Sequence, residues 1–221
     1  KFESLTVWID CSSEGEKREF AVAFAALGKA EGAIPLKKLE IQNADFDATE
    51  FFKSKRCSRL MEIELDKCKF TEAAMTALAE NVKETLGVVE FLAPTGENYS
   101  YQIGILLEGC PKIWKIRVND VNDEILHRIG RAFNSGRHQP QLKSFDAWTH
   151  NEGTVTMDGL RAVVPALGEV IHLDTSFPIE GTEPFMTIVN ACPKLKIIRG
   201  MTGGMFDRLQ PLLPKHIQIL H

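Results

Sequence analysis

The sequence of 221 residues contains no long hydrophobic run. A helix that spans a membrane needs about 18 or more mostly apolar residues in succession, and no segment has that length. We therefore expect no contact with a membrane. The chain opens Lys1-Phe2-Glu3-Ser4, without a start methionine and without the apolar core of a signal peptide. These features predict a fragment of a longer protein that works in the cytoplasm or the nucleus.

A surplus of positive charge is also missing. The chain has 26 Lys and Arg residues against 30 Asp and Glu residues, which gives a formal net charge of −4. Proteins that bind nucleic acids or anionic membranes usually carry a basic surplus or a basic patch. We expect no nucleic acid among the partners.

Motifs for metal binding and for catalysis are absent from the sequence. The 5 cysteines form no CxxC pair, and the 6 histidines show no HxxxH or CxxH spacing. His150, His172 and His216 are far apart, and no GxSxG nucleophile motif accompanies them. The glycine-rich segment 200–204 lacks the Gly-Lys-Ser/Thr ending of a phosphate-binding loop. We expect no disulfide scaffold, no metal, no cofactor and no enzymatic activity.

What the sequence does contain is internal repetition. Cys57, Cys110 and Cys192 each begin the pattern cysteine, any residue, basic residue, aliphatic residue. A redox sensor would need one such cysteine, whereas packing in a repeat protein needs one per repeat. We therefore interpret these cysteines as small buried side chains in equivalent positions, reduced and without metal.

A longer pattern runs through the chain: aliphatic, two variable residues, aliphatic, one variable residue, aliphatic. The clearest copy begins at Leu60 and continues to Cys68 and Phe70. Its second aliphatic position recurs at spacings of 24, 26, 27, 29, 25 and 28 residues, at Leu39, Ile63, Val89, Ile116, Phe145, Val170 and Ile198. This period predicts about eight irregular repeats that form a single domain over residues 1–221.

Each repeat is expected to hold one strand and one helix. Alternating aliphatic residues predict a strand with one buried face. Thr71 and Asn122 are suitable N-caps for the helices that follow them, and Pro165 is expected to disturb a helix that begins near Met157.

The sixth repeat allows two registers. Leu167-x-x-Val170 would turn His172 into the core, whereas Ile171-x-Leu173 would turn it outward. The two registers exchange the faces of the strand, and the sequence leaves both open.

These repeats resemble the cysteine-containing leucine-rich repeats of F-box proteins and of the ribonuclease-inhibitor-like superfamily. The resemblance covers nearly the whole chain, and it implies an α/β fold: a leucine-rich repeat solenoid in the form of a right-handed βα superhelix, with a parallel sheet on the concave side and helices on the convex side. The family places asparagine or cysteine where the strand turns away, as at Cys68, but Ala44, Pro94 and Val121 stand there in other repeats.

Residues between the aliphatic positions of each strand are expected to point to the concave side. An acidic strand, a strand with apolar Val88 and Leu92, and a basic strand follow one another there. Trp148 either anchors a partner or folds under the loop that follows it. The charged face either binds a partner or is solvated, with ion pairs across strands such as Glu90 with Arg117. The predicted protein-binding residues are Glu40, Gln42, Glu62, Glu64, Asp66, Val88, Glu90, Leu92, Lys115, Arg117, Asn119, Asp146 and Trp148.

A protein-interaction domain is the function that this pattern favours. The resemblance to F-box proteins implies recruitment of a target protein to a ubiquitin ligase, with an F-box upstream of residue 1 that would bind the ligase scaffold. The alternatives are a ligand-sensing or autoinhibitory repeat domain of a nucleotide-binding immune-type receptor, and an assembly scaffold unrelated to ligases.

Overall fold

A computed structural model describes residues 3–9, 13–32, 34–92, 99–138, 141–149, 154–176, 182–199 and 207–220. Its contacts divide the chain into two compact units, Lys1–Ile113 and Trp114–His221, called unit 1 and unit 2 below. Pro94, His150 and the glycine-rich segment 200–204, which were named above, lie outside the described residues, as does Cys11.

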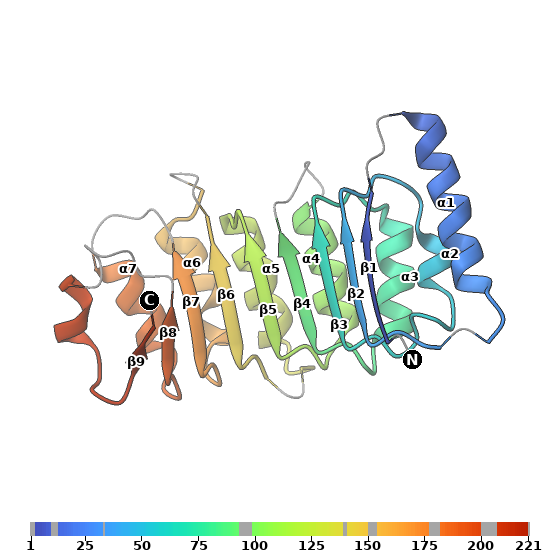
Figure 1. The fold of residues 1–221 in the computed structure, drawn as a ribbon. Coiled ribbons are helices and arrows are strands. Elements are labelled where there is room, and N and C mark those ends of the chain that lie inside the picture. Colours follow the sequence, from blue (N-terminus) through green and yellow to red (C-terminus); the bar gives the residue numbers. More distant parts are fainter. Residues whose placement is uncertain are drawn as a thin grey trace. The chain divides into compact units, whose positions relative to one another are not determined.

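Unit 1 alternates strands with helices along the chain (Figure 1). Its strands pair in parallel in chain order, and Leu5, Leu39, Ile63 and Val89 lie side by side. The elements are β1 (Ser4–Trp8), α1 (Glu14–Lys29), β2 (Lys38–Gln42), α2 (Thr49–Phe52), β3 (Glu62–Asp66), α3 (Glu72–Val82), β4 (Val88–Leu92) and α4 (Tyr99–Gly109).

Unit 2 repeats the same order. Its strands are also parallel neighbours in chain order, and Ile116, Phe145, Leu173 and Ile198 lie in register. The elements are β5 (Lys115–Asn119), α5 (Asp123–Asn134), β6 (Ser144–Trp148), α6 (Met157–Val163), β7 (His172–Ser176), α7 (Glu183–Asn190), β8 (Ile197–Arg199) and β9 (Gln218–Ile219), with short 3₁₀ helices at Val164–Ala166 and Gln210–Leu212.

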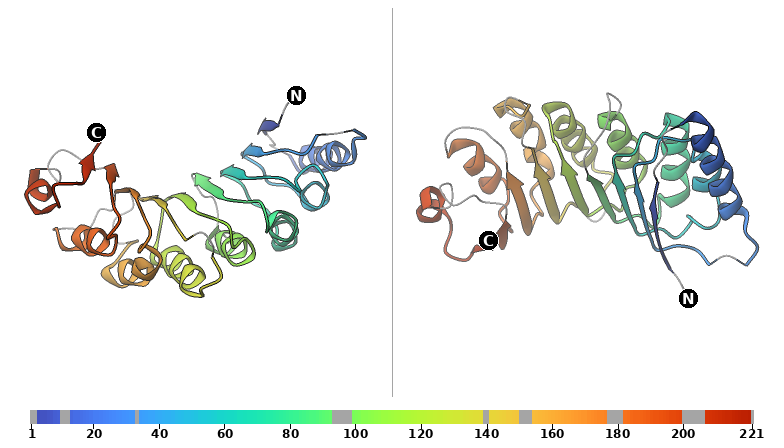
Figure 2. Two further views of the ribbon diagram at one scale, coloured as in Figure 1. Left: turned by 90° about the horizontal axis from the view of Figure 1, so that it is seen from below. Right: turned by 45° about the horizontal axis from the view of Figure 1, so that its top comes forward.

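Each unit is therefore a solenoid-like βα repeat arrangement, and the predicted α/β fold class is confirmed. In both units the helices cover one face of the sheet and leave the opposite face, the open face, without helices (Figure 2). The aliphatic positions of the strands point to the helices: Leu39, Ile63, Ile116 and Phe145 are fully buried. Residues between them, such as Glu64, are only partly buried on the open face.

Helices α3 and α5 begin at the predicted capping residues. The Thr71 hydroxyl accepts from the Ala74 N–H, and the Asn122 side chain accepts from the Ile125 N–H. Both predicted N-caps are confirmed. Helix α6 ends at Val163 and continues as the 3₁₀ helix that contains Pro165, because proline cannot donate the backbone bond that an α-helix requires.

The three repeated cysteines occupy equivalent turns. The carbonyls of Cys57, Cys110 and Cys192 each accept the N–H of the aliphatic residue three positions later, at 3.0–3.3 Å. All three are free and buried, as predicted. Leu167 takes the same place in the sixth repeat, since its carbonyl accepts the N–H of Val170 at 3.0 Å.

This turn corrects the assignment of the sixth repeat. Leu173, and not Val170, lies in register with Phe145 and Ile198. Val170 lies one aliphatic position earlier in the repeat. The prediction that Val170 marks the period is therefore wrong, and Leu173 marks it instead. The structure adopts the register in which His172 lies on the open face, where it is exposed.

The strand ends share a further local feature. Asn43, Lys67 and Asp120 directly follow β2, β3 and β5, and all three have φ between 51° and 56°. This left-handed conformation costs energy for residues other than glycine and is best tolerated by asparagine and aspartate. It turns the chain so that the next side chain, Cys68 in the third repeat, returns to the core, where it is 5% exposed.

Candidate functional site: the open faces of the two sheets

The open face of unit 1 carries three rows of side chains, because parallel strands in register place equivalent residues side by side. The middle row is Thr6, Glu40, Glu64 and Glu90. Three carboxylates therefore lie on adjacent strands, about 4.8 Å apart from strand to strand. Like charges in such positions cost stability unless they are solvated or matched.

Lys38 partly offsets this negative charge. Its Nζ lies 2.8 Å from Glu40 Oε1 and 2.6 Å from Glu62 Oε1. The hydrogen bonds to Glu40 and Glu62 raise the pKa of Lys38. The hydrogen bond from Lys38, together with that from Thr6 at 2.8 Å, lowers the pKa of Glu40. The open-face positions of the four strands nevertheless hold five carboxylates against one ammonium: Glu40, Glu62, Glu64, Asp66 and Glu90 against Lys38.

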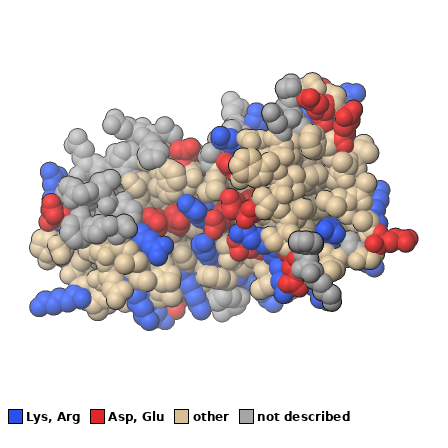
Figure 3. Space-filling view, viewed as in Figure 1, with Lys and Arg blue, Asp and Glu red and all other residues tan. Residues whose placement is uncertain are grey.

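Apolar side chains flank these charges. Val88 and Leu92 are partly exposed at the two ends of β4, and Trp8 on β1 is 73% exposed. Glu90 lies between Val88 and Leu92 and is only 7% exposed. Figure 3 looks onto the open face and shows acidic and basic side chains among uncharged surface. The face of unit 1 is thus acidic with apolar margins.

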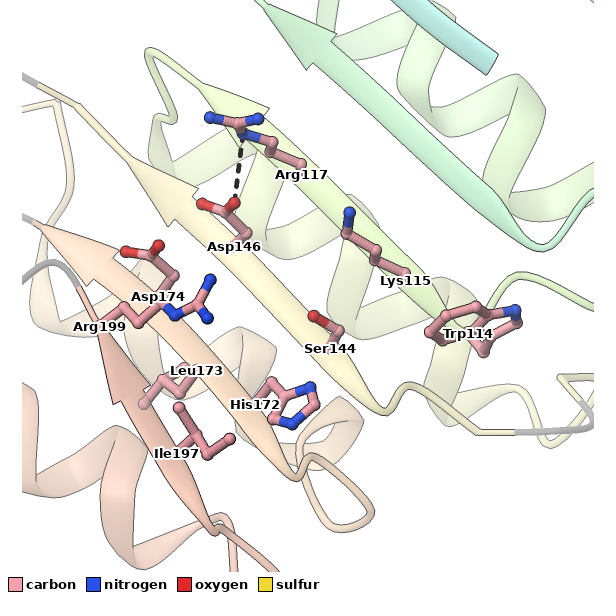
Figure 4. Close-up of a pocket in the computed structure, with 10 residues that line it drawn as sticks. All are labelled: Trp114, Lys115, Arg117, Ser144, Asp146, His172, Leu173, Asp174, Ile197 and Arg199. Atoms are coloured by element: carbon pink, nitrogen blue, oxygen red, sulfur yellow. Dashed lines mark ion pairs between the residues drawn. The ribbon is translucent and has the colours of Figure 1, made fainter. Parts of the chain in front are cut away.

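The open face of unit 2 is different in charge and in shape. Side chains on its strands line a hollow of about 530 Å³ (Figure 4). The hollow is lined by Trp114, Lys115, Arg117, Ser144, Asp146, His172, Leu173, Asp174, Ile197 and Arg199. Three of these residues are basic and two are acidic, apart from the histidine.

The register sorts these residues into two rows. The first row runs from β5 to β8 as Lys115, Ser144, His172 and Ile197. It contains no carboxylate. Trp114, which directly precedes Lys115, is 39% exposed and lines the hollow beside Lys115, toward the start of β5 (Figure 4).

The middle row of unit 2 is Arg117, Asp146, Asp174 and Arg199. Arg117 Nε lies 3.2 Å from Asp146 Oδ2. Burial raises the pKa of Asp174, and the charges of Arg199 and Arg117 oppose this shift. The row therefore has two charges of each sign, with the acids in the centre and an arginine at each end.

The structure places every predicted binding residue on an open face, at the positions that the alternation of strand residues indicated. It separates them into two groups, one on each unit. Arg117, Lys115 and Asp146 line the hollow, whereas Asn119 and Trp148 belong to a third row outside it. Trp148 faces outward and is partly buried, and its role as an anchor remains a prediction.

Sequence reasoning missed most of the hollow, because only Lys115, Arg117 and Asp146 of its lining were predicted as binding residues. Asp174, His172, Ile197 and Arg199 were not predicted as binding residues. The ambiguous register of the sixth repeat obscured β7, and β8 has only three residues. The signal that could have identified His172 and Asp174 is their position on either side of Leu173, an aliphatic residue of the strand pattern.

Comparison with protein-family models found no match to this chain. A search of curated proteins likewise found no matching relative. The conclusions about function therefore depend on the residues and their geometry.

Neither a metal site nor a reactive cysteine is evident in the described part of the chain. No group of three or more His, Cys, Asp or Glu side chains there could hold a metal ion. Burial raises the pKa of Cys57, Cys68, Cys110 and Cys192 to about 12, which keeps these thiols protonated and poorly nucleophilic at neutral pH. None of the described helices has the length and apolarity needed to cross a membrane.

Proposed function

We propose that this chain is a protein-interaction domain whose open faces bind a partner protein. The single observation that carries the proposal is the contrast between the two faces of each sheet. One face is sealed by helices, while the other exposes charged, aromatic and aliphatic side chains in regular rows. A rigid sheet with such rows is suited to a protein surface, since its side chains are held in place by the strands beneath them.

Charge complementarity defines the kind of partner. The open face of unit 1 has five carboxylates and one ammonium, and it fits a basic surface. The hollow of unit 2 has a basic surplus, and it fits an acidic one. A partner that carries both a basic and an acidic patch, with apolar residues beside them, would complement both units.

Recruitment of a target to a ubiquitin ligase is the more specific form of this proposal. It is supported by the equivalent cysteine turns at Cys57, Cys110 and Cys192, which resemble those in the repeats of F-box proteins. The free cysteines also suit the reducing cytoplasm or nucleus. An upstream F-box in the full-length protein would favour this form, whereas a nucleotide-binding module would favour an immune-type receptor, and neither would favour an assembly scaffold.

The test is affinity capture with the full-length protein, followed by quantitative mass spectrometry. Glu64→Lys reverses a charge in the middle row of unit 1, and Glu80→Lys makes the same change at an exposed position of α3. We expect a specific partner to be lost from Glu64→Lys and retained by Glu80→Lys. Equal recovery of all partners by both variants and the wild type would contradict the role of this face.

A further inference from the structure

The hollow of unit 2 allows the partner chemistry to be defined more closely. This inference rests on the proposed function, because it concerns the segment of the partner that enters one open face. The hollow is bounded by side chains of β5, β6, β7 and β8 and by Trp114 (Figure 4).

The first row of the hollow offers hydrogen-bond donors. Lys115 carries an ammonium, Ser144 a hydroxyl and His172 an imidazole, and they lie side by side on three adjacent strands. Ser144 is the smallest of the three, so the surface dips between its two neighbours. An anionic group placed over Ser144 would have a donor on each side and one beneath it.

The middle row does not cancel this preference. Its two carboxylates are each adjacent to an arginine: Asp146 to Arg117, at 3.2 Å, and Asp174 to Arg199 in the register of β7 and β8. With two charges of each sign, the row is neutral as a whole. Together with Lys115 in the first row, the lining holds three basic and two acidic residues, so positive charges outnumber negative ones.

Apolar side chains stand near both ends of the first row. Trp114 lies next to Lys115, toward the start of β5, and Ile197 forms the β8 end (Figure 4). The three strand spacings from β5 to β8 amount to about 14 Å. An extended chain of about five residues covers this distance, at about 3.4 Å per residue.

From this arrangement we infer that the hollow binds an extended segment of the partner protein that presents an acidic side chain between two apolar ones. The acidic side chain sits over Ser144 between Lys115 and His172. One apolar side chain packs against Trp114, and the other packs against Ile197. The segment runs across the strands, along the first row.

A basic anchor fits less well. To reach Asp146 or Asp174, a lysine or arginine of the partner would pass between Arg117 and Arg199 and beside Lys115. It would compete with Arg117 for Asp146 and be repelled by Arg199 near Asp174. A basic side chain of the partner is therefore the alternative to an acidic one, and the peptide experiment below distinguishes the two.

The experiment uses the 221-residue chain and four short peptides. Acetyl-Leu-Ser-Glu-Ser-Leu-amide has the inferred pattern, and two matched peptides carry Gln or Lys in place of Glu. The fourth has Gln at the centre and a free terminal carboxylate. Binding is followed through the indole N–H signal of Trp114 in NMR spectra, which the variant Trp114→Phe identifies among the 3 tryptophans.

We expect the Glu peptide to shift the Trp114 signal and to bind about tenfold more tightly than the Gln peptide. Lys115→Gln should reduce this preference to about twofold or less. Lys143→Gln removes the same charge from an exposed residue outside the hollow, and it should leave the preference intact.

Several results would overturn the inference. Equal affinities for the Glu and Gln peptides, or no saturable shift with any peptide, would show that the hollow does not select an acidic side chain. Tighter binding of the Lys peptide would assign a basic anchor. Tighter binding of the peptide with the free carboxylate would assign a chain terminus instead of an internal residue. Each of these leaves the capture test with Glu64→Lys intact, because that variant lies in unit 1.

Discussion

Arg117 and Asp146 form an ion pair across the strands β5 and β6, with Arg117 Nε 3.2 Å from Asp146 Oδ2. The Asp146 side chain is 16% exposed, whereas that of Arg117 is 40% exposed. The carboxylate is therefore the more buried partner, and the charge of the arginine helps to compensate its own.

Replacement of this arginine should lower stability. We expect Arg117→Gln to reduce the free energy of unfolding by about 1 kcal/mol, between the values for exposed and for buried ion pairs. Arg131→Gln removes a charge from an exposed residue at the end of α5 and should have almost no effect. Chemical denaturation of both variants measures the difference, and equal stabilities would show that the ion pair contributes nothing. Because Arg117 has this structural role, Lys115 is the better position for tests of binding.

Asp174 gives a pH dependence of opposite sign to that of most carboxylates. Burial raises its pKa in the folded state, so the folded protein binds its proton more tightly than the unfolded chain does. Stability must then fall as the pH rises from the ordinary carboxyl range, about 3.9, through the raised pKa. We expect Asp174→Asn to melt at a higher temperature than the wild type at pH 7, with a smaller gap near pH 4. A variant that melts lower than the wild type at pH 7 would show that Arg199 and Arg117 outweigh the cost of burial.

Thr175 is an exception within the core of unit 2. It occupies an aliphatic position beside Ala147 and is 2% exposed. Among the described residues its hydroxyl has no hydrogen-bond partner. A buried hydroxyl without a partner costs about 1–3 kcal/mol, so Thr175→Val should raise the free energy of unfolding by about 1 kcal/mol. Thr156→Val, which removes the N-cap hydroxyl of α6, should lower it instead. A loss of stability in Thr175→Val would mean that its hydroxyl is satisfied.

Helices α5 and α6 approach each other at Gly130. A Cβ at this position would overlap the carbonyl oxygen of Ala162, so the backbone contact requires glycine. We expect Gly130→Ala to destabilise the chain by about 2 kcal/mol, measured by thermal or chemical denaturation. Gly168→Ala is the matched control, since a Cβ there would meet no atom within 4 Å. If both variants were equally stable, the helices would be shown to separate at little cost.

The sequence predicted the features that depend on local periodicity. The aliphatic pattern located β2 to β6 and their buried faces, and the residues Thr71 and Asn122 located the starts of α3 and α5. These predictions succeeded because each needs only a few neighbouring residues. The alternation along each strand also assigned the predicted binding residues to the open face.

Features that depend on contacts between repeats were harder to predict. Leu167 is aliphatic but occupies the place that a cysteine holds in other repeats, so the sequence left two registers open for the sixth repeat and Val170 was wrongly taken as its periodic position. Rows across strands, such as Glu40, Glu64 and Glu90, become visible only when the register is known. The hollow also requires the small side chain of Ser144 beside larger neighbours, which is a property of the assembled sheet.

We propose above all that the open face of unit 1 binds a partner through its charge. Isothermal titration of the captured partner against wild type, Glu64→Lys and Glu80→Lys, at about 50 mM and about 500 mM salt, tests it most directly. The account predicts that Glu64→Lys weakens the affinity about tenfold or more at low salt and by a smaller factor at high salt, while Glu80→Lys matches the wild type. Wild-type affinity of Glu64→Lys at both salt concentrations would contradict it.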